Sequence, residues 1–217
     1  MLTIHHLGRS QSERILWLCE ELGVPYALEL YRRDPVTMLG PPEYKALHPM
    51  GGAPVITDGA VVLGESGAVI EYIIARHGGG RLRPGPDDPD FVPFLYWFHF
   101  ANGTLQPALS RNLTASRLPS SADDPILRAM RQRQDLALAT LEARLAESDY
   151  LAGAELTAAD IMTVFSLTTM RLFYPIDLAP WPAILAYLQR IGARPAYRRA
   201  MAHGDPDLVP LLGASPS

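Results

Sequence analysis

Near its start the chain alternates strand-like and helical patterns in a way that limits the folds open to it. Residues 2–6 form a short apolar run, and the apolar residues that follow are spaced as on one face of a helix: Ile15, Leu18, Cys19 and Leu22. Gly23-Val24-Pro25 ends this helix, as glycine and then proline commonly do, and residues 26–31 read as a second strand. A strand, a helix and a strand at this spacing predict a βαβ unit with two parallel strands.

The rest of the first half completes a small mixed sheet. Residues 32–52 are polar and rich in proline, and they are too long for a plain connection, so we expect them to carry function. Two β-prone runs, 54–57 and 60–63, flank Asp58-Gly59, which predicts a hairpin with a two-residue turn. One face of the next predicted helix is formed by Val69, Ile70, Ile73, Ile74 and His77. The predicted order is βαβ followed by ββα.

Beyond residue 78 the strand signals disappear. Residues 78–90 have a linker composition, with three consecutive glycines followed by prolines and aspartates. Residues 91–115 read as helical and aromatic-rich, a long helix follows, and two more helices begin after Trp181-Pro182 and Arg194-Pro195. Thr157 and Asp160 have the spacing of a capping box at a further helix start. The sequence predicts an α/β domain over 1–78, a linker over 79–90 and an all-α helical bundle over 91–217.

Composition and charge exclude several classes of protein. The 19 basic and 23 acidic residues are scattered, so the basic stripe typical of a nucleic-acid binder is absent. No apolar run is long enough for a membrane span, and the start lacks the pattern of a signal peptide, so we expect a soluble, cytoplasmic protein. The single cysteine excludes an internal disulfide and a cysteine-rich zinc site.

Several titratable residues have ordinary explanations. His5 and His6 are adjacent on a strand and point to opposite faces, so they cannot form a paired metal site, and no metal-ligand spacing occurs elsewhere. Two acidic pairs, Asp87-Asp88 and Asp123-Asp124, read as solvated loop charges or helix caps.

The loop between the first strand and the first helix is one candidate for chemistry. A helix N-terminus offers free N–H groups and the positive end of the helix dipole, which stabilise a thiolate. A hydroxyl from Ser10 or Ser12 there can donate a hydrogen bond to the sulfur. The alternative is that one of these serines simply caps the helix.

Two further segments suggest binding of a peptide-like ligand. Proline after small residues suggests a cis peptide bond at Ala53–Pro54, which would let the Val55 backbone pair with an extended ligand. The alternative there is a trans proline on an edge strand. Ser66 reads as the N-cap of the next helix, where a ligand carboxylate could bind, and Glu65 could hold an ammonium group beside it. Simple capping is again the alternative.

Taken in order, these segments resemble the glutathione S-transferase family over almost the whole chain. His5-His6-Leu7 leading to Ser10 and residues 13–26 are similar to its first strand and helix. His48-Pro49-Met50-Gly51 through Pro54-Val55 is similar to its cis-proline segment, Glu65-Ser66 to its γ-glutamyl-binding pair, and residues 156–161 to the capping box of its all-α domain. The resemblance implies a thioredoxin-like N-terminal domain followed by an all-α domain, and it is nearest to a bacterial and fungal subgroup with a serine in the first loop.

The resemblance also implies roles for individual residues. Ser10 would hold the glutathione sulfur as a thiolate, and the remaining contacts to glutathione would come from His48, Gly52, Ala53, Pro54, Val55, Glu65 and Ser66. Gly52 stands where relatives often carry a lysine for the glycine carboxylate, so Arg14, His48 or Lys45 would have to replace it. Cys19 lies on the apolar stripe of its helix and reads as a core residue.

The aromatic segment after the linker has two interpretations. Tyr96, His99 and Asn102 are candidates for a second-substrate pocket or for contacts to a partner subunit, together with Trp97 and Phe100. An aromatic stripe at helical spacing is more often core, and we expect that of at least three of these five.

The function implied is transfer of glutathione to hydrophobic electrophiles, with peroxidase activity as a second reaction. Alternatives on the same scaffold are a glutathione-dependent disulfide reductase, isomerase or dehalogenase, or a non-catalytic binding module, since a fold alone does not fix function. Glutathione would be a co-substrate and no cofactor would be permanently bound. A homodimer is implied, without nucleic-acid or membrane partners.

Overall fold

The computed structural model describes residues 1–117, 119 and 124–215. Contacts divide the chain into two compact units, Met1–Arg83 with Gly192–Pro210, and Pro84–Ile191 with Leu211–Ser217. This division assigns the last helix to the first unit, whereas the domain boundaries expected from sequence put it in the second half. Those boundaries stay a prediction, and each unit is described by itself.

The first unit is built on a four-stranded mixed sheet in the order β2-β1-β3-β4. Its strands are β1 (Leu2–Leu7), β2 (Ala27–Tyr31), β3 (Val55–Asp58) and β4 (Val61–Gly64). β1 and β2 are parallel, as the βαβ pattern predicts, and β3 runs antiparallel to both of its neighbours. Its helices are α1 (Glu13–Leu22), α2 (Pro42–Lys45), α3 (Ser66–Arg76) and α9 (Pro195–Gly204). The α/β class of the first half is therefore confirmed.

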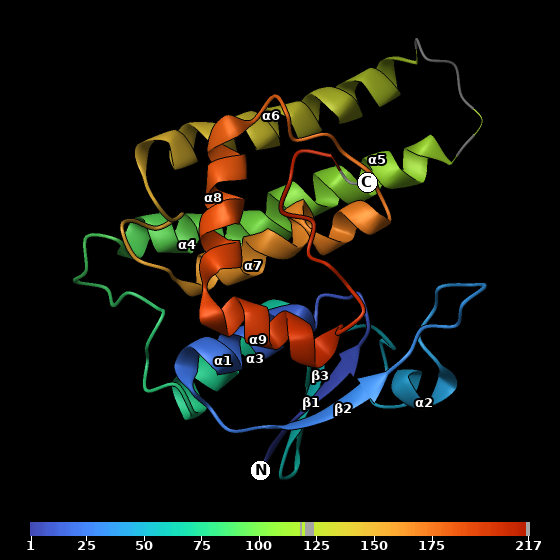
Figure 1. Cartoon of the computed structure of the whole chain (residues 1–217), viewed down its shortest axis with the longest axis vertical. Coiled ribbons are helices and arrows are strands. Elements are labelled where there is room, and N and C mark those ends of the chain that lie inside the picture. The colour runs from blue at the N-terminus through green and yellow to red at the C-terminus, as the bar shows by residue number, and fades with distance from the viewer. Residues whose placement is uncertain (118, 120–123, 216–217) are drawn as a thin grey trace. The chain divides into compact units, whose positions relative to one another are not determined.

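Helix α1 is the centre of this unit and packs against both α3 and α9 (Figure 1). Its apolar residues Ile15, Leu16 and Leu18 are fully buried, and Gly23 ends it with a φ of 63°, a conformation that glycine adopts without a steric penalty. Against α9, the rings of Trp17 and Tyr197 meet edge to face at 5.1 Å.

The predicted position of the hairpin turn in this unit is wrong by one residue. The hairpin turn consists of Gly59 and Ala60 rather than Asp58 and Gly59, because Asp58 still pairs with Val61 in the sheet. Its carboxylate accepts hydrogen bonds from Tyr72 and His77, at 3.0 and 2.7 Å, which keeps Asp58 in the strand. Gly59, with a φ of 61°, takes the first turn position.

The start of α3 also differs from the sequence-based expectation. Helix α3 begins at Ser66, the cap position is Glu65, and no side-chain capping hydrogen bond forms there. The Ser66 hydroxyl bonds instead to the side chains of Gln11, in the loop before α1, and Arg14, in the first turn of α1. A tertiary contact thus takes the place of the local cap.

The described part of the second unit is helical. Its elements are α4 (Phe91–Phe100), a π-helical segment (Ala101–Leu105), α5 (Gln106–Ser116), α6 (Pro125–Glu147), α7 (Ala158–Leu167), a 3-10 turn (Thr169–Leu172) and α8 (Pro182–Ala193) (Figure 1). All ten residues of α7 are buried, so this helix forms the core of the unit. Asp124 caps α6, as expected, whereas Asp123 lies outside the described residues. No helix among those described is both long and apolar enough to cross a membrane.

The predicted capping box at the start of α7 is confirmed and extends into a buried network. Thr157 accepts from the backbone N–H of Ala159, and Asp160 accepts from the backbone N–H of Thr157 at 2.9 Å. The fully buried Asp160 carboxylate also accepts from the backbone of Leu151 and from the Tyr187 hydroxyl, both at 3.0 Å. One carboxylate therefore joins the start of α7 to the preceding loop and to α8.

Removing this carboxylate is expected to destabilise the protein strongly. Asp160→Ala leaves several buried donors without their acceptor, and each unsatisfied group carries a desolvation cost, so we expect a loss of about 3 kcal/mol or more in unfolding free energy. Asp124→Ala, which removes an exposed cap from Ile126, is the matched control and should cost about 1 kcal/mol. Urea unfolding monitored by circular dichroism measures both, and equal losses would contradict the prediction.

Candidate functional site

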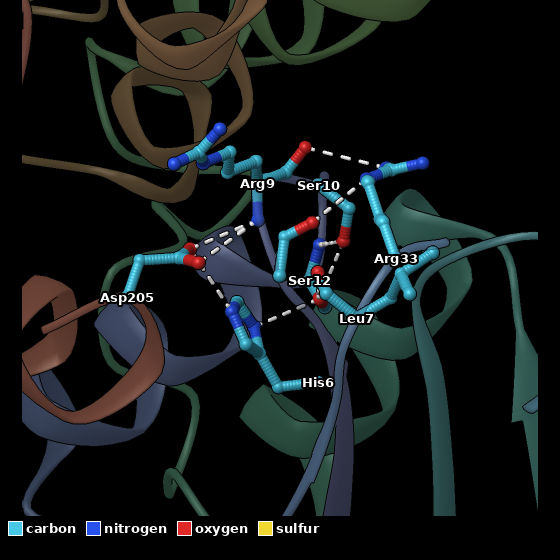
Figure 2. A network of polar contacts seen from close by, with 8 residues as sticks. His6, Leu7, Arg9, Ser10, Ser12, Arg33 and Asp205 are labelled. Atoms are coloured by element: carbon cyan, nitrogen blue, oxygen red, sulfur yellow. Dashed lines mark hydrogen bonds and ion pairs between the residues drawn. The ribbon is translucent and has the colours of Figure 1, made fainter. Parts of the chain in front are cut away.

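The loop between β1 and α1 is held from two sides (Figure 2). On one side, the Asp205 carboxylate, which follows α9, accepts the backbone N–H of Arg9 with its two oxygens, at 3.0 and 3.1 Å. On the other side, the Arg33 guanidinium donates to the carbonyls of Gly8 and Arg9, at 2.8 and 3.3 Å. A charged group thus fixes each side of the backbone that leads into Ser10.

Ser10 lies three residues before the first residue of α1 and is 4% exposed. Its Oγ lies 2.7 Å from the Oγ of Ser12 and accepts the backbone N–H of Ser12 at 3.2 Å. The Ser10 carbonyl accepts the N–H of Glu13, the first residue of α1. The hydroxyl singled out from sequence is therefore at the positive end of the helix dipole, where a negative charge is favoured.

The backbone is unusual before each of the two candidate serines. Arg9, before Ser10, has a φ of 54°, and Glu65, before Ser66, has a φ of 68°. Such angles cost free energy for residues with a side chain, and they concentrate at functional sites, where the surrounding structure holds them in place. Met38 and Leu82 also have positive φ, but only Arg9 and Glu65 of these four described residues directly precede the serines that the motifs identify.

A buried cation lies beneath the start of α3. Arg14, 1% exposed, donates to the Oε1 of Gln11 at 2.6 Å and to the hydroxyl of Ser66 at 3.1 Å. The Ser66 hydroxyl in turn donates to Gln11 at 3.1 Å. Burial lowers the pKa of Arg14 to about 9, with the nearby Glu13 opposing the shift, so Arg14 remains a cation at neutral pH.

Gln11 was not among the residues expected from sequence. Its position in the loop was the only signal, because its contact with Ser66 joins two segments that are far apart in the chain. The neighbouring Glu65 is exposed, so its carboxylate faces solvent beside this cluster.

The cis-proline segment lies at the start of β3. The peptide bond Ala53–Pro54 is cis, as predicted, and Val55 is the first residue of β3, between β1 and β4. Gly52 is exposed, and a Cβ added there would meet no atom within 4 Å, so the backbone at this point is open.

Two of the residues considered as replacements for the missing lysine lie near this segment. The side chain of the exposed Lys45 passes Gly51, where an added Cβ would lie 3.5 Å from its Cβ and Cγ atoms. The His48 ring packs at a similar distance against Gly64, and its Nδ1 accepts the backbone N–H of Met50 at 3.3 Å. Arg14, the third candidate, is committed to Gln11 and Ser66.

The aromatic candidates belong to the second unit. Tyr96, which is 54% exposed, and His99, also exposed, are on α4, and Asn102 is in the π-helical segment. Trp97 and Phe100 are buried, as expected for core residues. The expectation that at least three of the five are core is met only if Asn102, which is partly buried, is counted with them.

No sequence motif indicates the groups that anchor the loop. Arg33 belongs to a segment expected to carry function, but Asp205 follows the last helix and has no motif around it. Asp205 lies with Arg33, Arg9 and His6 around a cavity of about 410 Å³ in the first unit. Within the described part of the chain, no three His, Cys, Asp or Glu side chains are grouped so that they could hold a metal ion.

Comparisons with known proteins agree with this architecture. The family model described as the N-terminal domain of glutathione S-transferase matches residues 9–76, and that of its C-terminal domain matches residues 108–195. Glutathione S-transferase 3 of Schizosaccharomyces pombe is 30% identical over 213 residues, covering 92% of this chain and 86% of the relative.

Solved structures are similar over nearly the whole chain. The crystal structure of a glutathione S-transferase from Actinobacillus pleuropneumoniae has a TM-score of 0.86 and 30% identity, covering 94% of this chain and 93% of that one. A theta class glutathione S-transferase from Xanthomonas axonopodis pv. citri, solved with glutathione bound, has a TM-score of 0.69 and 29% identity, covering 92% and 96%. The predicted combination of a thioredoxin-like half and an all-α half is thereby confirmed.

Cys19 is expected to be inert in the folded protein. Its side chain is fully buried in α1, and burial, with a smaller contribution from Glu20, raises the pKa of its thiol to about 12. Because the thiolate is the reactive form, a thiol reagent such as dithionitrobenzoate should modify native protein far more slowly than protein unfolded in guanidinium. Rapid modification of the native protein at mildly alkaline pH would show that Cys19 is accessible and contradict the core assignment.

Proposed function

Because this chain belongs to the glutathione S-transferase family, we propose that it binds glutathione on the first unit and transfers its thiolate to hydrophobic electrophiles. The observation that carries the proposal is the contact between the two candidate segments. Ser66 at the start of α3 is hydrogen-bonded to Gln11, which lies between Ser10 and Ser12 in the sequence, and to Arg14, which lies two positions after Ser12. One tripeptide can therefore meet both segments.

The γ-glutamyl end of glutathione is assigned to Glu65, Ser66 and Arg14. Its carboxylate would accept from the Ser66 hydroxyl and from backbone N–H groups at the start of α3, with the buried Arg14 cation behind them. Its ammonium group would pair with the exposed Glu65 carboxylate. The zwitterionic end of the ligand would then have a partner for each charge.

Ser10 is assigned to the sulfur. Lowering a thiol pKa by two units requires about 2.7 kcal/mol. A hydroxyl hydrogen bond to the anion together with the N-terminal end of α1 is sufficient for this. The buried position of Ser10 favours the interaction, because little water competes for the hydroxyl.

The cysteinyl and glycyl parts of glutathione are assigned to the cis-proline segment. The backbone of Val55 would pair with the cysteinyl unit, with Ala53, Pro54, Gly52 and His48 around it. For the glycine carboxylate we propose Lys45, because its side chain passes Gly51 while Arg14 is committed elsewhere.

The finer assignments belong to the same proposal. They are the serine-type subgroup, peroxidase activity as a second reaction, a homodimer, a cytoplasmic location, and a role for Tyr96, His99 and Asn102 toward the electrophile or a partner subunit. Disulfide reduction through a protein thiol is disfavoured, because Cys19 is buried and its thiol has a raised pKa. Isomerase and dehalogenase reactions, and a non-catalytic module, remain outcomes of the test below.

Ser10→Ala is expected to separate catalysis from binding. Conjugation of a chloroaromatic substrate at neutral pH should fall about 100-fold, because the hydrogen bond that favours the thiolate is lost. Glutathione affinity, measured by calorimetry, should change little, and Ser10→Thr, which keeps a hydroxyl, should retain part of the activity. Unchanged turnover in Ser10→Ala would refute the role of Ser10, and absent glutathione binding by the wild type would refute the proposed function.

Lys45→Met is expected to weaken glutathione binding without slowing the chemical step. Loss of an exposed charge pair should raise the KM for glutathione about fivefold at low ionic strength and less in high salt, with kcat nearly unchanged. Lys45→Arg, which keeps the charge, is the matched control. Equal KM values for Lys45→Met and the wild type at low salt would show that another group binds the glycine carboxylate.

A further inference from the structure

A chain of hydrogen-bonding side chains connects Ser10 with the end of α9 (Figure 2). The pair Ser10–Ser12 continues to His6, whose Nδ1 lies 2.9 Å from the Oγ of Ser12. On the far side of the ring, the Nε2 of His6 lies 3.1 Å from a carboxylate oxygen of Asp205. The side chain of His6 is 1% exposed and that of Asp205 is 11% exposed, so this row of hydrogen bonds has little contact with solvent.

The carboxylate fixes the direction of every hydrogen bond in this chain. Because a carboxylate only accepts, a neutral His6 carries its hydrogen on Nε2, and its Nδ1 is an acceptor. Ser12 then donates its hydroxyl hydrogen to His6 at 2.9 Å, in preference to the carbonyl of Leu7 at 3.4 Å. The hydrogen between the two serines must come from Ser10. In this state Ser10 has no hydrogen left to donate to a sulfur atom.

We propose that His6 accepts the proton that glutathione loses, through Ser12 and Ser10, and that Asp205 holds His6 in the tautomer that can accept it. The inference rests on the proposed function. The thiol S–H bond breaks as its proton passes to Ser10, the Ser10 proton passes to Ser12, and the Ser12 proton passes to Nδ1 of His6. Each hydroxyl gains one proton and loses one. The net products are a thiolate and an imidazolium that faces the Asp205 carboxylate.

The transfer reverses the hydrogen bonds and so creates the donor that the thiolate needs. Afterwards His6 donates to Ser12, Ser12 donates to Ser10, and Ser10 donates to the sulfur. If His6 lost the new proton while the thiolate remained, Ser12 would turn back to His6, and the two serine oxygens would face each other at 2.7 Å without a hydrogen. The proton is therefore retained for as long as the thiolate is present. His6, Ser12 and Asp205 are positioning residues, because none of them touches the sulfur.

Charged groups of both signs surround His6. Those around the adjoining cavity are Arg9, Arg32, Arg33, Asp205 and Asp207. Burial lowers the pKa of Arg33, and Asp205 opposes that shift. From β1, His5 bonds instead to Tyr31 and Thr57. At the end of α9, Gly204 lies close to the ring, since a Cβ there would lie 3.0 Å from the Nε2 of His6 and 2.7 Å from Leu16.

The same cavity provides a route for resetting the chain. It measures about 410 Å³ and is lined by both His6 and Asp205, which is ample space for water. Once the thiolate has been consumed, Ser10 again donates inward and His6 returns its proton to solvent on this side. Proton removal and product formation then occur on different sides of the loop.

Counting protons tests the proposal on the wild-type protein. Glutathione is added at neutral pH, the thiolate is quantified by its ultraviolet absorbance, and proton release is measured with an indicator dye. S-Methylglutathione, which has no thiol proton, provides the value to subtract. We expect thiolate to form with a proton release well below one per thiolate, because the proton stays on His6. Release of one proton per thiolate would overturn the inference and leave the proposed function standing, whereas absence of glutathione binding would overturn both.

Two variants test the individual links. Asp205→Asn can still accept from Arg9, but its amide donates to His6 and moves the ring hydrogen to Nδ1, so Ser10 is already free to donate outward. In this variant, about one proton should therefore be released for each thiolate that forms. Ser12→Ala breaks the chain and should lower kcat/KM about 100-fold at neutral pH, with a smaller loss at alkaline pH, where solvent hydroxide can remove the proton.

A purely structural role predicts different results. If Asp205 only anchors α9 to the loop, proton release per thiolate will be the same in Asp205→Asn as in the wild type, and that result would overturn the inference. An unchanged pH profile of kcat/KM in Ser12→Ala would do the same. Circular dichroism establishes that each variant is folded, and if one is not, the wild-type proton count still decides.

Discussion

The carboxylate of Asp205 holds the end of α9 against the loop that follows β1, and the geometry of the candidate site depends on this contact. It accepts the backbone N–H of Arg9 with both oxygens and the ring of His6 with one. The close approach requires glycine at the end of α9, because a Cβ at Gly204 would lie 2.7 Å from Leu16 and 3.0 Å from His6. The Asp205 carboxylate therefore restrains a loop that would otherwise be flexible.

The two candidate serines, Ser10 and Ser66, have similar backbone surroundings but different groups behind them. Ser10 lies in the loop that leads into α1, Ser66 is the first residue of α3, and each follows a residue with a positive φ. A buried cation, Arg14, lies behind Ser66, whereas a buried chain of hydrogen bonds through Ser12 and His6 lies behind Ser10. In the proposed function, the segment at Ser66 binds a permanent negative charge, and the segment at Ser10 binds a charge that appears during the reaction.

Much of the fold followed from patterns that act over short distances. The parallel strands, the end of α1 at Gly23 and the capping box of α7 were predicted because each depends on neighbouring residues. The errors arose where a distant partner intervened. Asp58 stays in its strand because Tyr72 and His77 bind it, and Ser66 gives up its cap role because Gln11 and Arg14 bind it.

The sequence by itself determined the order of the elements, the positions of both serines and the core position of Cys19, because hydrophobic period, caps and turns are local properties. Only the tertiary structure decided which groups meet those serines. Gln11 meets Ser66 across 55 positions, and Asp205 meets His6 across 199. Contacts over such separations leave no periodic trace in the chain, since they are set by how α9 and α3 pack against α1.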